Sequence, residues 1–412
     1  MNAPKYLEKY AFQAPVIQEK PSLELNQIVV IPCFDEPDLW SSLRSLYNCD
    51  ATKGAVEVIV VLNQSENAGE LDNNQKVLAQ FPQWKAEHDS DLKKFHLISA
   101  LNLPKKHAGV GLARKIGMDE AVYRFHLSGK EDGIITCFDA DSGCLSNYLT
   151  AVEAHFEQYP KTPGCSVYFE HPLTGEDYPN ENYEAIYDYE LFLRYYRQGL
   201  LYAQHPVAFH TIGSSMAVRT SAYCKQGGMN RRKAGEDFYF LQKIIALGGF
   251  TDLITISVIP SPRVSHRVPF GTGKAVGDAI SLNQETEGYA PQVFEDIRLF
   301  LTTIDGLYEG EEMVGDWPES IIAFLKESDW EQALLHMRKQ STNLKTFRKH
   351  FFHWFDGFKV LKLVHFVRDH FYPNRAIKVV GAELLQMMGE EVGQKGLLAT
   401  YRKLDRRGNN PD

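Results

Sequence analysis

Two aspartates, Asp139 and Asp141, follow an apolar run that starts at Gly133 and has the composition of a buried β-strand. Side chains of an extended segment alternate between its faces, so these two point the same way if the strand continues through them. Hard cations such as Mg²⁺ and Mn²⁺ prefer oxygen ligands and share them with substrate phosphates. The pair therefore predicts a metal and diphosphate site. A turn after a strand is the alternative, because the same triplet occurs in a polar stretch at Asp89-Ser90-Asp91.

Size, charge and cysteine usage narrow the class of protein. A chain of 412 residues with 44% hydrophobic and 24% charged residues indicates a globular protein of two or three domains. The net charge of −9 argues against nucleic acid as a partner. Six cysteines without a C-x-x-C pair indicate reduced thiols. Because the sequence shows neither a signal peptide nor a run of about 18 apolar residues, we expect a cytoplasmic protein.

Short runs rich in β-branched residues recur through the first third of the chain, with helical patterns between them. The predicted strands are Ile28–Ile31, Val56–Leu62, His96–Ser99 and Ile134–Phe138, and the predicted helices are Asp38–Leu46 and Val110–Tyr123. This alternation predicts an α/β fold with a Rossmann-like, mostly parallel mixed sheet and right-handed crossovers. Ligands of such sheets bind beyond the carboxyl ends of the strands, so the residues after each strand are the candidate site.

The rest of the chain departs from this alternation. Its middle third predicts helices at Leu145–Gln158 and Tyr183–Tyr202, strands at Cys165–Phe169, Val207–Ile212 and Leu253–Ile259, and a helix that opens at Glu236. From Glu287 onward the strand patterns give way to amphipathic helical ones. We therefore expect an N-terminal extension over 1–26, a catalytic domain over 27–286, a C-terminal helical region over 287–412, and a disordered tail from Arg406.

Five segments follow predicted strands or open predicted helices, in a fixed order. They are Pro32-Cys33-Phe34-Asp35-Glu36, Leu62-Asn63-Gln64, Gly109-Val110-Gly111-Leu112-Ala113-Arg114, Asp139-Ala140-Asp141 and Gly235-Glu236-Asp237. In this order they resemble the signatures of the family 2 glycosyltransferases, over roughly residues 27 to 275. The resemblance implies the glycosyltransferase A-type fold, with 27–145 as the nucleotide-binding half and 146–286 as the acceptor half.

The resemblance implies which residues meet the sugar donor, a nucleoside-diphosphate sugar. They are Pro32, Phe34, Glu36, Asn63, Arg114 and Asp139. Arg114 can bind phosphate oxygens bidentately. Asn63 departs from the family, which has a carboxylate there; its carboxamide both donates and accepts, so the identity of the base stays open.

The resemblance also implies metal ligands and a catalytic base. Asp141 binds Mn²⁺ or Mg²⁺ directly, with Asp139 beside it and His266 as a third ligand after the last strand; a structural histidine is the alternative. Asp237, supported by Glu236, removes the acceptor proton, and the reaction inverts the anomeric centre. The alternative for this acidic pair is stabilisation of a helix N-terminus.

The acceptor is the least defined part. Ser214, Ser215, Arg263 and Arg267 are candidate contacts, and the loop that carries the two arginines suits either an anionic acceptor or the donor diphosphate. Aromatic residues of 183–202 border the acceptor or pack in the core. Three other functions stay open: a retaining transferase of the glucosyl- or mannosyl-phosphoglycerate type, a nucleotidyltransferase, and a non-catalytic carbohydrate-binding protein.

The segment Lys345–Phe355 mixes basic and aromatic residues, as helices that lie on membranes do. It predicts a peripheral contact with the inner membrane face, a homodimer contact, or packing on the rest of the chain.

Overall fold

The computed structural model describes residues 2–233, 235–265, 271–282, 284–310 and 317–410. The chain forms two compact units. Unit 1 contains Met1–Tyr178, Thr211–Lys274 and Arg406–Asp412, and unit 2 contains Pro179–His210 and Ala275–Asp405. This division differs from the expected boundary after residue 286, because Pro179–His210 groups with the C-terminal helices.

Within the described residues, unit 1 is built on an eight-stranded sheet of order β3-β2-β1-β4-β7-β6-β8-β5. The strands are β1 (Leu25–Cys33), β2 (Ala55–Ser65), β3 (Lys93–Leu103), β4 (Ile134–Cys137), β5 (Gly143–Cys144), β6 (Gly164–Phe169), β7 (Met216–Arg219) and β8 (Thr251–Ile259). The strands β3, β2, β1 and β4 are parallel, as are β6 and β8, whereas β7 runs antiparallel to both β4 and β6. The predicted α/β fold with a mostly parallel mixed sheet is confirmed.

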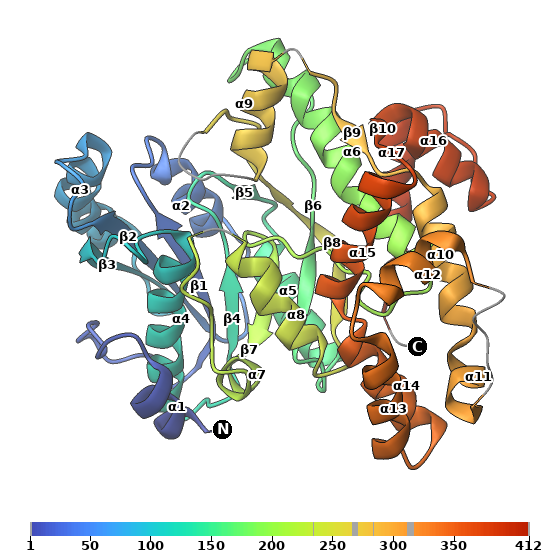
Figure 1. Ribbon diagram of the computed structural model, residues 1–412. Helices are drawn as coiled ribbons and strands as arrows, with labels where there is room; N and C mark the ends of the chain where they lie inside the picture. The colour runs from blue at the N-terminus through green and yellow to red at the C-terminus, as the bar shows by residue number, and fades with distance from the viewer. Residues whose placement is uncertain (1, 234, 266–270, 283, 311–316, 411–412) are drawn as a thin grey trace. The chain divides into compact units, whose positions relative to one another are not determined.

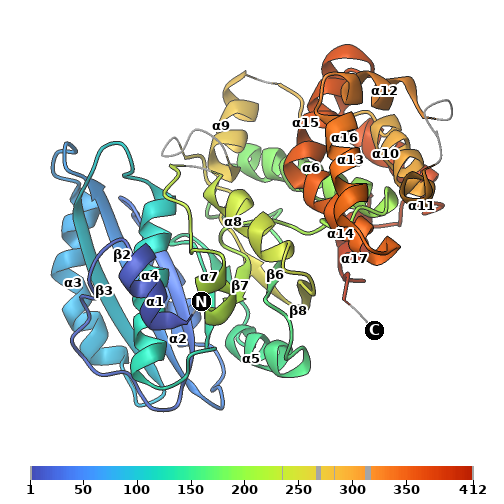
Figure 2. The same ribbon diagram turned by 60° about the horizontal axis from the view of Figure 1, so that its bottom comes forward.

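The central strands are apolar because both of their faces are covered, as in other parallel sheets. The helices of unit 1 are α1 (Ala3–Tyr10), α2 (Leu39–Tyr47), α3 (Asp72–His88), α4 (Val110–Leu127), α5 (Tyr148–Gln158), α7 (Thr220–Lys225) and α8 (Glu236–Ile245), and α9 (Thr272–Leu282) starts at its border. Helix α4 lies on one face of the sheet with α1 beside it, and α3 lies on the other (Figures 1 and 2). At Gly117 of α4 an added Cβ would be 2.4 Å from Val30 of β1, so glycine lets the helix approach the strand closely.

The N-terminal extension is part of unit 1. Tyr6 donates a hydrogen bond of 2.6 Å to Asp119 on α4, and the backbone N–H of Phe12 donates to the same carboxylate at 2.9 Å. The next residue of α4, Glu120, accepts from the backbone N–H of Val16 at 2.9 Å. Buried acidic residues of α4 thus bind the first segment of the chain.

Two sequence predictions are corrected by the structure. Residues 207–212 form no strand; the strand lies later, at β7, where Met216 is in register with Cys137 of β4. The tail from Arg406 to 410 is ordered, because Asn410 accepts a hydrogen bond from the backbone of Asp252 at 2.7 Å and donates back at 3.0 Å. Arg406 reaches the carbonyl of Ile254 at 2.9 Å. Hydrogen bonds to β8 therefore hold a segment whose polar composition alone indicates disorder.

Unit 2 is helical and gathers around the long helix α6. Its elements are α6 (Asn180–Tyr202), α10 (Gln292–Thr302), α11 (Ile304–Glu309), α12 (Glu319–Lys326), α13 (Trp330–Gln340), α14 (Leu344–Trp354), α15 (Gly357–His370), α16 (Ile377–Met387), α17 (Leu397–Asp405) and the two-residue strands β9 (Glu287–Gly288) and β10 (Arg375–Ala376). The aromatic residues of α6 contribute to the core: the Tyr195 ring lies 5.6 Å from that of Phe294, and Tyr195 is fully buried.

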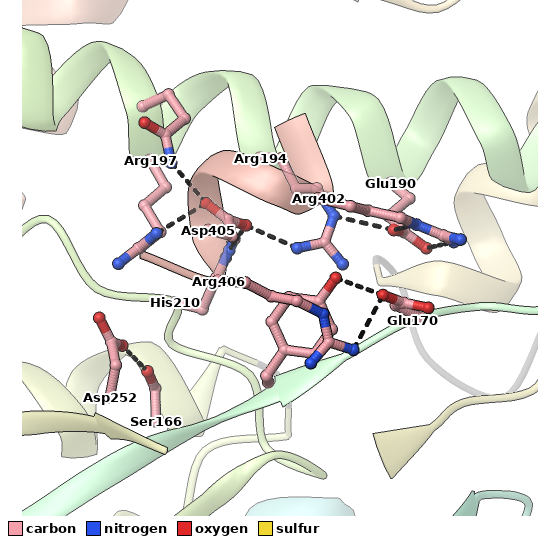
Figure 3. A network of polar contacts seen from close by, with 12 residues as sticks. Ser166, Glu170, Glu190, Arg194, Arg197, His210, Asp252, Arg402, Asp405 and Arg406 are labelled. Carbon is pink, nitrogen blue, oxygen red and sulfur yellow. Dashed lines mark hydrogen bonds and ion pairs between the residues drawn. The ribbon is translucent and has the colours of Figure 1, made fainter. Parts of the chain in front are cut away.

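A buried ionic network joins α17 to α6. Asp405 accepts hydrogen bonds of 2.6 Å from both Arg194 and Arg197, and His210 lies 2.8 Å away (Figure 3). One turn along, Glu190 pairs with Arg402 (Figure 3). Although burial alone would raise it, the pKa of Asp405 is held far below its usual range by His210 and the two arginines. The carboxylate is therefore ionised inside the unit.

The basic and aromatic segment forms α14 and the residues just after it. Phe347, Phe351 and Phe355 are fully buried, whereas Lys345 and Lys349 are exposed. Its buried aromatic residues pack inside unit 2, and the membrane and dimer contacts stay predictions. None of the helices in the described residues is long and apolar enough to cross a bilayer.

Candidate active site

The loop between β1 and α2 is held in an unusual backbone conformation. Asp35 has a φ of 45°, in the left-handed region, where non-glycine residues are uncommon and are retained mostly at functional sites. Its N–H donates to Asn74 of α3 at 3.0 Å, and Asn74 donates to Gln64 at 3.1 Å. This fixes the loop so that Glu36, the next residue, is buried. Sequence reasoning missed Asn74, a buried polar residue in an amphipathic helix.

Strand β4 ends at Cys137, and the chain then turns. The N–H of Ser142 donates to the carbonyl of Asp139 at 3.1 Å, closing the turn. The hydroxyl of Ser42 on α2 lies 2.8 Å from the carbonyl of Ala140 and 2.6 Å from that of Ser142. The strand therefore does not continue through Asp139 and Asp141, and the two carboxylates contact different arginines. The Ser42 hydroxyl therefore stabilises this turn, and the sequence analysis did not identify Ser42 as a site residue.

Arg114 in the first turn of α4 joins two carboxylates. Its guanidinium donates to Asp139 at 2.5 Å and to Glu236 in the first turn of α8. Arg114 and Glu236 are buried, and Asp139 is 36% exposed. Burial opposes the charge of Arg114, but Asp139 and Glu236 raise its pKa above the usual value. The predicted residues Arg114, Asp139 and Glu236 thus form one cluster.

Gly111, in the first turn of α4, allows the backbone around Arg232 to approach this helix closely. A Cβ on Gly111 would lie 2.3 Å from the carbonyl oxygen of Arg232 and 2.9 Å from Cβ of Glu236. Gly213 is equally confined, since its Cβ would lie 2.4 Å from Arg114. The first turn of α4, the segment before β7 and the segment before α8 therefore pack closely against one another near Arg114.

Asp237 is fixed by two backbone N–H groups. Its Oδ2 accepts from Gly213 at 2.9 Å and its Oδ1 from Phe238 at 2.8 Å. Asp237 is half-buried, whereas Glu236 is buried against Arg114. Burial raises the pKa of both acids, that of Glu236 to about 7 because Arg114 offsets only part of the effect and Asp237 adds to it. Of the two acids, Asp237 is therefore the one that a bound substrate or solvent can reach.

Arg263, which follows β8, contacts Asp141, the second aspartate of the β4 turn. Its guanidinium donates to both oxygens of Glu36, at 3.0 and 2.7 Å, and to Asp141 at 3.3 Å. It was predicted as an acceptor residue; the structure places it beside the proposed metal ligand. Three carboxylates from the ends of β1 and β4 are thus matched by two arginines.

The other predicted donor residues lie along the same edge. Pro32 is buried in β1 opposite Val61, and Phe34 is half-buried in the loop that follows. Asn63 is buried near the end of β2, and among the described residues its Oδ1 has no hydrogen-bond donor. A buried acceptor without a partner is costly, which makes it a candidate ligand contact.

The predicted acceptor serines precede β7. Ser214 and Ser215 are buried, and β7 runs antiparallel to β4 from the Met216–Cys137 pair, which brings these serines next to the start of the β4 turn. The hydroxyl of Ser215 has no partner among the described residues. His266 and Arg267 lie outside the described residues. Within the described part of the chain, no three His, Cys, Asp or Glu side chains form a ready metal cluster.

The site lies at the carboxyl ends of β1 and β4 and at the N-termini of α4 and α8, the arrangement of α/β enzymes that bind phosphorylated ligands. Residues 28–225 match the sequence model of the family described as Glycosyl transferase family 2. The chain therefore carries a family 2 glycosyltransferase domain, as its motifs predicted, and its reaction is glycosyl transfer. No curated protein matches the chain.

Three solved structures show remote similarity to the chain. S. aureus TarS residues 1–349 are 14% identical, with 89% of this chain and 92% of that chain covered and a TM-score of 0.39. The same protein in complex with UDP-GlcNAc is 14% identical, with coverages of 80% and 91% and a TM-score of 0.42. The mannosyltransferase PcManGT from Pyrobaculum calidifontis, in complex with GDP-Man and Mn²⁺, is 17% identical over 60% of this chain and 58% of that chain, with a TM-score of 0.34. TM-scores below 0.5 are too low to assign a substrate or a mechanism.

Proposed function

We propose that this protein is a metal-dependent, inverting glycosyltransferase that moves a sugar from a nucleoside-diphosphate sugar to an acceptor hydroxyl. The observation that carries the proposal is the position of Arg114, which joins Asp139 of the β4 turn to Glu236 of α8. A donor-side carboxylate and the proposed base region therefore share one fixed cation. Such preorganised charge is the main source of catalysis where a diphosphate leaves.

The donor set fits a divalent metal. Asp139 and Asp141 are 36% and 31% exposed, and their oxygens are the hard ligands that Mg²⁺ and Mn²⁺ prefer. These ions commonly take one or two carboxylates and complete their shell with water and substrate phosphates. Arg114 holds Asp139 at 2.5 Å, whereas the contact of Arg263 with Asp141 is longer, at 3.3 Å, so Asp141 is the residue that would hold the metal. Bound there, the metal would supply charge stabilisation for the leaving diphosphate.

Asp237 is the proposed general base. A base must reach the acceptor hydroxyl, and Asp237 is half-buried while two backbone N–H groups fix its orientation. It takes the proton as the hydroxyl attacks the anomeric carbon, in a single displacement with inversion. Arg114 stays on Glu236 and Asp139, which holds the geometry at each side of the reacting centre.

We place the reaction in the cytoplasm. All six cysteines are free thiols in the structure, which suits a reducing compartment. The acceptor stays open, and the exposed Arg231, Arg232 and Lys233 before α8 favour an anionic one.

The experiment measures turnover of UDP- and GDP-sugars by the full chain with Mn²⁺ or Mg²⁺, against Asp237→Asn and Asp141→Asn. We expect each variant to retain its fold and to lose turnover by roughly 10²- to 10⁴-fold. Asp91→Asn, an exposed aspartate in the polar triplet, is the matched control and stays active. Product analysis by NMR gives the anomer. Full activity of Asp237→Asn would remove it as the base, and retained configuration would replace inversion with retention.

A further inference from the structure

Arg263 contacts Asp141, the carboxylate that is proposed to bind the metal. Its guanidinium approaches both oxygens of Glu36 at 3.0 and 2.7 Å and the Oδ2 of Asp141 at 3.3 Å. The three residues come from the loops after β8, β1 and β4, all at the carboxyl edge of the sheet.

The two contacts of Arg263 are unequal. Glu36 is 1% exposed and receives both donors of the guanidinium fork, the strong bidentate arrangement. Asp141 is 31% exposed, and its contact with Arg263 is longer, at 3.3 Å. Arg263 is itself 24% exposed. Glu36 therefore anchors the arginine, and Asp141 is the partner that it can leave at lower cost.

A divalent cation and a guanidinium cannot both approach Asp141 closely without repelling each other. Their positive charges repel each other, more strongly for a divalent ion than for a monovalent one, and solvent around these partly exposed groups reduces the repulsion. Arg263 and the metal are thus competitors for one ligand.

We propose that Glu36, Arg263 and Asp141 form a latch on the metal site: Arg263 holds Asp141 until a divalent metal displaces it, and Glu36 retains the arginine beside the site. This rests on the proposed function, which assigns the metal to Asp141. The latch makes metal binding weak in the absence of a donor. A bound diphosphate strengthens metal binding, because it attracts both the metal and the displaced guanidinium.

The test measures Mn²⁺ affinity of the full chain by electron paramagnetic resonance of the free ion, without nucleotide and with UDP or GDP. We expect Arg263→Gln to bind Mn²⁺ roughly five- to tenfold more tightly than the wild type without nucleotide. Arg263→Lys retains the charge but loses the bidentate anchor on Glu36, so its Mn²⁺ affinity lies between those of the wild type and Arg263→Gln. Nucleotide strengthens Mn²⁺ binding more in the wild type than in Arg263→Gln.

Arg263→Gln leaves the Glu36 carboxylate buried without the guanidinium, although the backbone N–H of Asp38 still donates to it at 3.2 Å, so a second variant guards against misfolding. Arg263→Gln combined with Glu36→Gln removes both charges, a change that is often tolerated, and it too binds Mn²⁺ more tightly than the wild type. Equal affinity in the wild type, the single and the double variant would overturn the latch while leaving the metal site intact. Absence of Mn²⁺ binding in every protein, with and without nucleotide, or wild-type binding by Asp141→Asn, would overturn the metal assignment itself.

Discussion

Arg114 and Asp139 are 25 positions apart in the sequence, yet the guanidinium of one donates to the carboxylate of the other at 2.5 Å. The same guanidinium reaches Glu236, a further 97 positions along the chain. Since Arg114 is buried, removing its charge leaves Glu236 buried without a cation, which is strongly unfavourable.

We expect Arg114→Gln to lower kcat by roughly 10²- to 10³-fold and to lower the melting temperature. Arg114→Lys retains the charge but cannot reach two carboxylates with a planar fork, so it recovers stability better than activity. Steady-state kinetics and thermal denaturation of both variants check this. Equal recovery of activity and stability by lysine would show that charge alone matters at this position.

The pH dependence follows from Glu236 and Asp237. Burial raises the pKa of Glu236 to about 7 and raises that of Asp237 above its ordinary value. Because Glu236 must be ionised to hold Arg114, and Asp237 to accept a proton, kcat/KM rises with pH and its acid limb lies near pH 7. In Glu236→Gln this limb moves to lower pH. A limb that stays in place in the variant would mean that another group titrates there.

Position 111 tests the close packing of the site. Alanine in place of glycine normally stabilises a helix, by up to about 1 kcal/mol. At Gly111 the sign reverses, because the new Cβ would lie 2.3 Å from the Arg232 carbonyl. We expect Gly111→Ala to cost about 1–3 kcal/mol, measured by chemical denaturation. Gly69→Ala, where an added Cβ meets nothing within 4 Å, is the control and has little effect.

Asn63 tests nucleotide recognition apart from folding. Its Oδ1 has no donor among the described residues, so Asn63→Leu removes a costly buried acceptor and leaves the melting temperature of the free protein equal or higher. Nucleotide affinity falls by roughly tenfold or more if the base binds there. Thermal shifts with UDP and GDP measure both effects. A drop in stability without loss of affinity would make Asn63 a structural residue.

Asp405 tests the ionic network of unit 2. Its folded pKa is depressed by His210, Arg197 and Arg194, so its contribution to stability is present above the unfolded pKa of about 3.9 and is lost as pH falls below it. We expect Asp405→Asn to cost about 3–5 kcal/mol near neutral pH and progressively less toward pH 3. Urea denaturation at several pH values measures this. Asp369→Asn, at an exposed ion pair, changes little. A cost independent of pH would point to lost packing instead of lost charge.

The sequence predicted the elements whose signals are local. The first four strands and α4 follow from β-branched runs and helical spacing. Asp139 follows from its place after the fourth strand, and Arg114 and Glu236 follow from their places at the starts of predicted helices. What it could not predict depends on contacts between distant residues. The turn at Asp139 is fixed by Ser42 on another helix, and the tail is ordered by Asp252. A single buried serine or a polar tail carries no pattern that a reader of the sequence can detect.

The catalytic unit is assembled from three separated stretches of the chain, the last of which begins at Arg406. A shortened protein that stops after β8, a natural choice from the motifs, would lack the hydrogen bonds of Asn410 to Asp252 and of Arg406 to Ile254. On the ribosome, too, the β8 strand emerges long before the residues that bind it. Unit 1 therefore acquires its last hydrogen bonds only when synthesis has passed through all of unit 2, and expression of the motif-bearing region alone is expected to yield a less stable protein.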